Sequence, residues 1–253
     1  MEKIIFEHDA KNEYVTITLN RPHKRNAISK TMIDELASAI DKAKMLNIKC
    51  LVIIGAEDKM FCAGGDLNYF HSQLTRDESF KRLYEMKEIL YELVSFPVPT
   101  ICLLNGDALG GGCELATACD IRIAKNNTKF GFVQGALGIT PGWGGGVLLY
   151  EKVNPNFALQ WLSEGITYTA DELKEAGWVH QVVSEVDFSN IKLLLANYLN
   201  KTIEQMQHFK QQYKQKLATI SLAALMNEEV RQCTQFWGSR IHQQKVANIF
   251  QNK

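Results

Sequence analysis

Two short glycine-bearing turns, each followed by a helix-like run, carry the residue types that could do chemistry. The first reads AGGDL at residues 63–67, and the second reads NGDALGGGCELATACD at residues 105–120. A strand, a glycine turn and a helix in series place free backbone N–H groups and the positive end of a helix dipole at one point. Two such N–H groups that converge on one oxygen form an oxyanion hole. The spacing therefore predicts an anion or oxyanion site, and the convergence of the two turns is a hypothesis.

Glu114 is the acid–base candidate of this pair of turns. It follows Gly111 by three residues, about one helical turn, so its carboxylate can face the same pocket. A purely structural interpretation is also open. The glycines would then only allow close packing, Glu114 would complement the positive start of the helix, and Asp66 would cap the helix after the first turn.

Strands and helices that alternate along the chain are expected to position the turns. Strand 14–19, a helix from Ser29 to about Met45 and strand 50–54 predict parallel strands joined by a crossover helix. The sequence further predicts a helix from Gln73 to Val94 and strands at 99–104, 120–124, 129–133 and 180–183. Residues 135–146 (GALGITPGWGGG) are expected to form a loop that gives backbone clearance or lines a pocket. Helices are expected at 113–118, 154–163, 170–176 and from about 186 onward.

Composition excludes several classes of protein. The 253 residues contain 28 Lys plus Arg and 28 Asp plus Glu, so no charge field points to nucleic acid or to a membrane surface. The apolar runs are too short to span a bilayer, and a secretory signal is not expected at the N-terminus. The six cysteines lack the spacing of a metal site, so reduced thiols in a cytoplasmic protein are expected, with no metal and no disulfide.

Four motifs in order resemble the enoyl-CoA hydratase/isomerase family, also called the crotonase superfamily. They are LNRPHKRNAIS at 19–29, FCAGGDL at 61–67, NGDALGGGCELATACDIRIA at 105–124 and FGFVQGALGITPGWGGG at 130–146. The resemblance implies an α/β fold, a spiral of ββα units with a C-terminal helical trimerisation region. Composition shifts near Asp187 to helix rich in Lys, Gln and Asn. We therefore expect an acyl-CoA-binding catalytic core at 1–186 and an oligomerisation region at 187–253, in a homotrimer or homohexamer.

The same resemblance implies roles for individual residues. The oxyanion N–H groups map to Gly65 and Gly111, and the ligand is an acyl-CoA thioester whose coenzyme A enters as part of the substrate, with no separate cofactor. Lys24 and Arg25 could pair with its phosphates, although either could equally be a surface charge. The remaining residues expected to bind substrate or coenzyme A are Ala27, Ala63, Gly64, Asp66, Leu67, Gly110 and Trp143. Residues expected to set the acyl chain length are Tyr69, Phe70, Leu137 and Trp143.

One departure from the family pattern bears on the reaction. Hydratases of the family resemble each other in two glutamates, and the second maps to Gln134. A glutamine can hold a water but cannot exchange a proton near neutral pH, whereas hydration uses two proton-transfer groups. Decarboxylation of a malonyl-type thioester gives the enolate directly and needs one proton donor.

Details also resemble the ethylmalonyl-CoA decarboxylase branch. These are GDLN at 65–68, ACDIR at 118–122, FV at 132–133, Trp143, and Trp237-Gly238. The expected function is therefore an acyl-CoA lyase, with decarboxylation of a short alkylmalonyl-CoA ahead of the alternatives. An ionised Glu114 would repel the substrate carboxylate unless an apolar site raised its pKa. The alternatives are an enoyl-CoA hydratase or isomerase with Glu114 as its only carboxyl, and a non-catalytic acyl-CoA-binding subunit.

Overall fold

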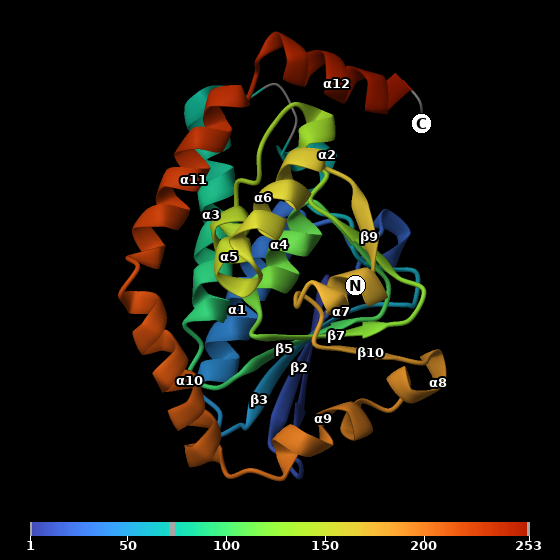
Figure 1. The fold of residues 1–253 in the computed structure, drawn as a ribbon, viewed down its shortest axis with the longest axis vertical. Helices are drawn as coiled ribbons and strands as arrows, with labels where there is room; N and C mark the ends of the chain where they lie inside the picture. The colour runs from blue at the N-terminus through green and yellow to red at the C-terminus, as the bar shows by residue number, and fades with distance from the viewer. Residues whose placement is uncertain (1, 71–73, 252–253) are drawn as a thin grey trace.

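Two β-sheets and a set of helices form the molecule in a computed structural model that describes residues 2–70 and 74–251 (Figure 1). The larger sheet has the strand order β1-β2-β3-β5-β7-β10 and the smaller has the order β4-β6-β8-β9. The strands of the larger sheet are β1 (Ile4–Asp9), β2 (Tyr14–Leu19), β3 (Cys50–Gly55), β5 (Thr100–Leu104), β7 (Ile121–Lys125) and β10 (Gln181–Val183). Those of the smaller sheet are β4 (Met60–Cys62), β6 (Asp107–Leu109), β8 (Lys129–Gly131) and β9 (Thr167–Thr169).

A ββα unit repeats along the chain. In each unit the first strand joins the larger sheet, the second joins the smaller sheet, and a helix follows. The units are β3–β4 with α2 (Leu67–Phe70) and α3 (Arg76–Val94), β5–β6 with α4 (Gly111–Ala118), and β7–β8 with η2 (Gln134–Leu137) and α5 (Gly145–Lys152). The strands of successive units pair in parallel in both sheets. The predicted α/β class and its ββα repeat are confirmed.

The first crossover follows the sequence pattern closely. Strands β2 and β3 pair in parallel, with Val15 opposite Leu51. Helix α1 (Lys30–Lys44) begins after Ser29, whose hydroxyl accepts a hydrogen bond from the Met32 N–H at 3.4 Å, as expected of an N-cap. Its buried face contains the apolar residues that recur at helical spacing, namely Met32, Ile33, Leu36, Ala39, Ile40 and Ala43.

Several element boundaries differ from those predicted. Gln73, the predicted start of the long helix, lies outside the described residues, and α3 itself begins at Arg76 after a capping box formed by Thr75 and Glu78. Helix α4 begins at Gly111, two residues before the predicted start at 113, because Gly110 is its N-cap. Strands β4, β6 and β9 were not predicted, since each has three residues and depends on partners distant in sequence. Strand β1 was also not predicted; it pairs antiparallel with β2.

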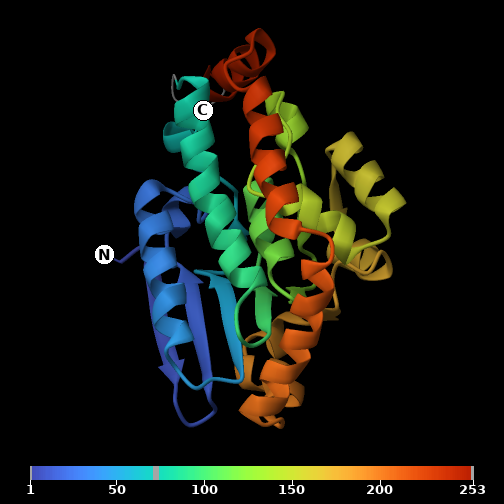
Figure 2. The ribbon, with the colours of Figure 1, turned by 90° about the vertical axis from the view of Figure 1, so that its left-hand side faces the viewer.

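Seven helices make up most of the C-terminal part of the described chain. They are α6 (Pro155–Glu164), α7 (Ala170–Glu175), α8 (Glu185–Phe188), α9 (Ile191–Leu199), α10 (Ile203–Ala218), α11 (Leu222–Phe236) and α12 (Arg240–Gln251). Helix α11 runs beside α3, and α12 crosses the end of both (Figures 1 and 2). Met226 and Val230 of α11 belong to the main core, while Phe188 and Leu195 pack with Val52 on the opposite face of the sheet. Residues beyond 187 therefore share the core, and their role in oligomerisation stays a prediction.

A buried ion pair attaches α10 to the start of β7. The Lys210 side chain is only 1% exposed and donates to Asp120, which also accepts a hydrogen bond from the Thr100 N–H at 2.8 Å. Lys152 Nζ lies 3.9 Å from the other Asp120 carboxylate oxygen. Among the described residues, none of the helices combines the length and apolar character needed to cross a bilayer.

Candidate active site

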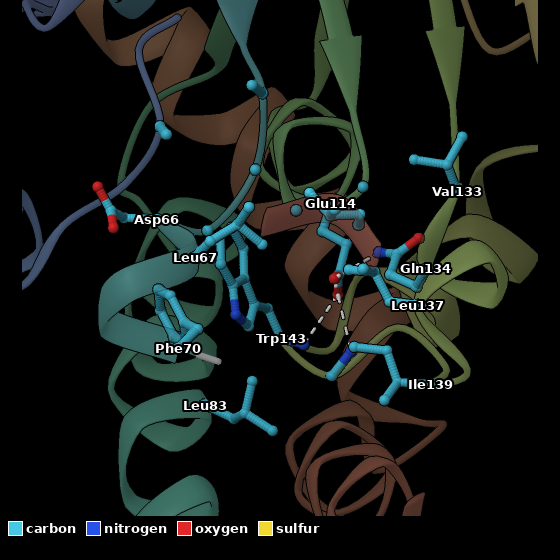
Figure 3. Close-up of a pocket in the computed structure, with 18 of the residues that line it drawn as sticks. Asp66, Leu67, Phe70, Leu83, Glu114, Val133, Gln134, Leu137, Ile139 and Trp143 are labelled. Carbon is cyan, nitrogen blue, oxygen red and sulfur yellow. Dashed lines mark hydrogen bonds between the residues drawn. The ribbon is translucent and has the colours of Figure 1, made fainter. Parts of the chain in front are cut away.

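One cavity of about 480 Å³ gathers the residues singled out in the sequence (Figure 3). Its wall is formed by the loop at residues 23–27, the two glycine turns, η2 and the loop that leads into α5, together with parts of α3, α11 and α12. The residues predicted to take part in catalysis or to bind substrate or coenzyme A line it, namely Lys24, Arg25, Ala27, Ala63, Gly64, Gly65, Asp66, Leu67, Gly110, Gly111, Glu114, Gln134 and Trp143.

The two glycine turns lie against each other. A Cβ atom at Gly64, where φ is +90°, would lie 3.1 Å from the backbone nitrogen of Gly111, so only glycine allows this approach. Ile28 fixes the first turn from its other side, since its N–H donates to the Gly64 carbonyl and its carbonyl accepts from the Asp66 N–H, both at 2.8 Å. The two glycine turns therefore meet at the backbone, and the convergence of their N–H groups on one oxygen stays a prediction.

The N–H groups of Gly65 and Gly111 are available to a ligand. Neither has a hydrogen-bond acceptor within residues 2–70 and 74–251, and both residues line the cavity. The Gly110 N–H, in contrast, donates to the Gly131 carbonyl at 2.8 Å. Gly111 is the first residue of α4, so its N–H also lies at the positive end of that helix.

An aromatic ring packs against each of these two glycines. A Cβ atom at Gly65 would lie 2.6 Å from the Phe70 ring, and one at Gly111 would lie 2.3 Å from the Trp143 indole. The two rings contact each other with centroids 5.5 Å apart. Leu83 and Ile139 extend this apolar wall next to the two glycine turns.

Glu114 is the carboxyl group at the centre of the cavity. It is 2% exposed and accepts four hydrogen bonds. The donors are Gln134 Nε2 at 2.9 Å, Trp143 N at 2.8 Å, Gly145 N at 3.0 Å and Gly142 N at 3.4 Å. Burial raises the pKa of Glu114 above its usual range, although the donors favour the ionised form and oppose this rise.

Gln134 is the side chain that approaches Glu114 inside the cavity. Its amide nitrogen is directed to Glu114 (Figure 3), which leaves its carbonyl oxygen buried with no hydrogen-bond partner among the described residues. The side chain is 7% exposed and lines the cavity. An unpaired buried acceptor has a free-energy cost, so this oxygen is suited to accept a hydrogen bond from a ligand or a water molecule.

The basic loop at the cavity mouth is held in an uncommon conformation. Arg25 and Asn26 both have positive φ, at 54° and 52°. Buried Asn26 stabilises this loop, since its side-chain amide donates to the carbonyls of Ala56 at 3.0 Å and Met60 at 2.8 Å. Lys24 and Arg25 therefore reach the mouth from a fixed backbone, which suits an anionic ligand group.

Two predicted roles change in the structure. Asp66 lines the cavity, but its carboxylate is paired with Arg21 and accepts from the Asn68 N–H at 2.9 Å, so it positions the turn. Tyr69, expected to set acyl chain length, is absent from the wall; its hydroxyl donates to Glu85 at 2.9 Å. Adjacent helix residues point in different directions, which is why Phe70 lines the cavity and Tyr69 does not.

The C-terminal helices contribute wall residues that sequence reasoning missed. Cys233, Trp237 and Ile249 line the cavity, and the Cys233 thiol donates to the Thr140 carbonyl at 3.1 Å. The Trp237-Gly238 pair was noted only as a resemblance, with no place in the site. No group of three His, Cys, Asp or Glu side chains in the described parts of the chain is arranged to hold a metal ion.

Comparison with known proteins agrees with this geometry. The crotonyl-CoA hydratase of Syntrophomonas wolfei is 36% identical over 207 residues, which cover 79% of this chain and 76% of that protein. The ethylmalonyl-CoA decarboxylase of Xenopus tropicalis is 34% identical over 173 residues, which cover 68% of this chain and 58% of that protein.

The fold is shared with solved structures. The crystal structure of an enoyl-CoA hydratase from Bacillus halodurans superposes with a TM-score of 0.87 at 21% identity, and covers 97% of this chain and 99% of that chain. The family profile described as enoyl-CoA hydratase/isomerase matches residues 9–251, which is nearly the whole chain. With the four sequence motifs gathered around one cavity, these matches show that the chain belongs to the enoyl-CoA hydratase/isomerase family.

Proposed function

We propose that the protein is an acyl-CoA lyase that decarboxylates a short alkylmalonyl-CoA through a thioester enolate. The observation that carries the proposal is the side-chain hydrogen bond from Gln134 to Glu114 at 2.9 Å. Gln134 is a neutral amide at the position of the expected second acid. Among the described residues that line the cavity, the carboxyl groups are Glu114 and Asp66, and Asp66 is paired with Arg21.

The mechanism assigns one task to each part of the cavity. Lys24 and Arg25 bind the phosphates of coenzyme A, and the thioester carbonyl oxygen accepts from the N–H groups of Gly65 and Gly111. The bond between the α-carbon and the carboxylate breaks, CO2 leaves, and the electron pair becomes the enolate, whose negative oxygen the two N–H groups stabilise. Protonated Glu114 then gives its proton to the α-carbon and is reprotonated from solvent.

The environment of Glu114 supports this role. Because burial raises its pKa, the neutral acid is more populated near neutral pH than for an exposed glutamate. A neutral Glu114 does not repel the substrate carboxylate. The apolar wall of Phe70, Leu83 and Trp143 also disfavours that carboxylate, and the loss of CO2 removes its charge from the apolar region.

Hydration of a short enoyl-CoA is a second candidate. The unpaired carbonyl oxygen of Gln134 can accept a hydrogen bond from a water molecule, and ionised Glu114 can take the proton of that water. The relative named crotonyl-CoA hydratase favours it as well.

Product analysis by mass spectrometry separates the two reactions. Purified protein is incubated separately with methylmalonyl-CoA, ethylmalonyl-CoA and crotonyl-CoA. We expect loss of CO2 from a malonyl ester and little change in crotonyl-CoA. A mass gain of one water on crotonyl-CoA, without CO2 loss from either malonyl ester, would contradict the decarboxylase proposal and support the hydratase.

The assembly and location are also proposals. A homotrimer or homohexamer is supported by exposed apolar side chains on the C-terminal helices, among them Phe209 (54% exposed) and Ile241 (60% exposed). The six cysteines are free and buried, which is compatible with a cytoplasmic protein. Light scattering during gel filtration would measure the mass of the assembly, and a monomer would contradict the oligomer.

A further inference from the structure

A second buried carboxylate, Glu229 of α11, binds the same backbone segment as Glu114. Glu229 accepts hydrogen bonds from Gly144 N at 2.8 Å, Gly146 N at 3.4 Å and Val147 N at 2.6 Å. Glu114 accepts from the N–H groups of 142, 143 and 145. The N–H groups of residues 142–147 are thus divided between two carboxylates, one on the cavity side and one on the side of α11.

Glycines allow this arrangement. A Cβ atom at Gly145 would lie 2.3 Å from Glu114 Cβ, and one at Gly146 would lie 2.9 Å from a Glu229 carboxylate oxygen. Gly144 has φ of +88°, and a Cβ atom there would lie 2.4 Å from Met226 of α11. The glycine run at 144–146 therefore lets both carboxylates approach the start of α5, whose helix dipole also favours negative charge.

The charged and polar groups that surround Glu229 come from α11, from α3 and from the Glu114 side chain. No Lys, Arg or His in the described chain forms an ion pair with either carboxylate. On α11 itself, Glu228 pairs with Arg231, and the Cys233 thiol faces Thr140. From α3, Arg76 donates to the Thr234 carbonyl. Burial, followed by the charge of Glu114, raises the pKa of Glu229 to about 8.

We propose that Glu229 is a positioning residue for the acid–base chemistry of Glu114. It acts in two ways: through the turn that both side chains bind, and through the resistance of two buried carboxyl groups to ionising together, which keeps a proton on the pair to higher pH. This inference rests on the proposed function, because it assumes that Glu114 is the group that transfers the proton. Glu229 does not line the cavity, so it does not contact substrate itself.

The test compares Glu229→Gln with a matched control, Glu228→Gln, in the full-length protein. Glu228 is the preceding residue on α11 and its side chain is about half exposed (51%). The Glu229→Gln change removes the second ionisable carboxyl group of the pair, so Glu114 should lose its proton at lower pH. In a plot of kcat for CO2 release against pH, activity falls on the alkaline side as Glu114 loses its proton. The pH of half-maximal kcat on that side should decrease by about one unit. KM should stay within about twofold, since no substrate contact is lost.

A second readout does not depend on the reaction. Glutamate labelled with 13C at the side-chain carboxyl allows the titration of Glu114 to be followed by NMR, with Glu114→Gln used only to assign its signal. The Glu114 titration should shift to lower pH in Glu229→Gln, stay unchanged in Glu228→Gln, and remain close to wild type in Glu229→Asp, which keeps the charge.

The outcomes separate the two proposals. A shifted Glu114 titration without any CO2 release would support the role of Glu229 and contradict the decarboxylase function. An unshifted Glu114 titration in folded Glu229→Gln would overturn the role of Glu229, whatever the reaction is. If Glu229→Gln does not fold, Glu229→Asp decides. If the pH profile of kcat in Glu229→Asp matches that of the wild type, the role of the second carboxyl group is supported. If kcat collapses in Glu229→Asp while the Glu114 titration is unchanged, that role is overturned.

Discussion

Gln134 donates its side-chain amide to the carboxylate of Glu114 over 2.9 Å, and both side chains are buried in the same cavity. At this position the family resemblance leads one to expect a second glutamate. A neutral partner that can only donate here leaves the proton transfer to Glu114 alone. The contact is therefore the structural feature on which the proposed reaction depends most.

Gln134→Glu should convert the site toward hydration. The new carboxyl would add a negative charge next to Glu114 and supply a second proton-transfer group. We expect CO2 release from ethylmalonyl-CoA to fall by about tenfold or more, with a gain in hydration of crotonyl-CoA. Both rates are measured on the same preparation, and Gln211→Glu on the exposed side of α10 is the control. Unchanged CO2 release in Gln134→Glu would mean that this position does not determine the reaction.

Gly111→Ala should lower kcat sharply, measured on protein shown to be folded by circular dichroism. Its Cβ would lie 2.3 Å from the Trp143 indole and so displace the ring or the N–H that faces the oxyanion. Loss of one oxyanion donor costs about 10²–10³ in kcat. Gly135→Ala is the matched control, because no atom lies within 4 Å of its Cβ position and its φ is not positive. Equal kcat in both variants would refute the assignment of Gly111.

Much of the fold follows from local patterns, and some of the site does not. The apolar spacing of α1 and the β-rich run at 14–19 are sufficient to predict those elements. The glycine pattern predicts two turns with free N–H groups, whereas the choice of Gly65 and Gly111 comes from the family resemblance. The place of Cys233 and Trp237 in the cavity wall depends on how α11 packs against α3, and no local signal in the sequence reports that packing. Glu229 was missed for the same reason, since its partners lie more than eighty residues away.

Asp120→Asn should destabilise the attachment of α10. The change would leave Lys210, 1% exposed, without its charged partner, and breaking a buried pair by removing one member costs about 3–5 kcal/mol. Urea unfolding of Asp120→Asn and Lys210→Met measures this loss. The double variant should recover part of the stability, since Lys210 is then no longer a buried charge without a partner, while Lys152 still loses Asp120. Additive losses in the double variant would show that the two side chains do not interact.

The stability of the wild type relative to Glu229→Gln should depend on pH. In the folded protein the pKa of Glu229 is about 8, compared with 4.5 for an unperturbed glutamate. Between these values the folded state binds more protons than the unfolded state, so the free energy of unfolding contributed by Glu229 decreases as pH rises. The Tm of wild type minus that of Glu229→Gln should therefore fall from pH 5 to pH 8. A difference that is constant over this range would show that Glu229 does not titrate there.

The most direct measurement uses ethylmalonyl-CoA labelled with 13C in its free carboxyl group, turned over in D2O. The one-acid decarboxylation predicts labelled CO2 and butyryl-CoA that carries one deuterium at the α-carbon, because the enolate receives its proton from a Glu114 that has exchanged with solvent. Glu114→Gln should still bind the thioester and release little CO2. The contrary result is a label that stays in the thioester. If the same wild-type protein binds coenzyme A esters and hydrates crotonyl-CoA, that result would contradict the central claim.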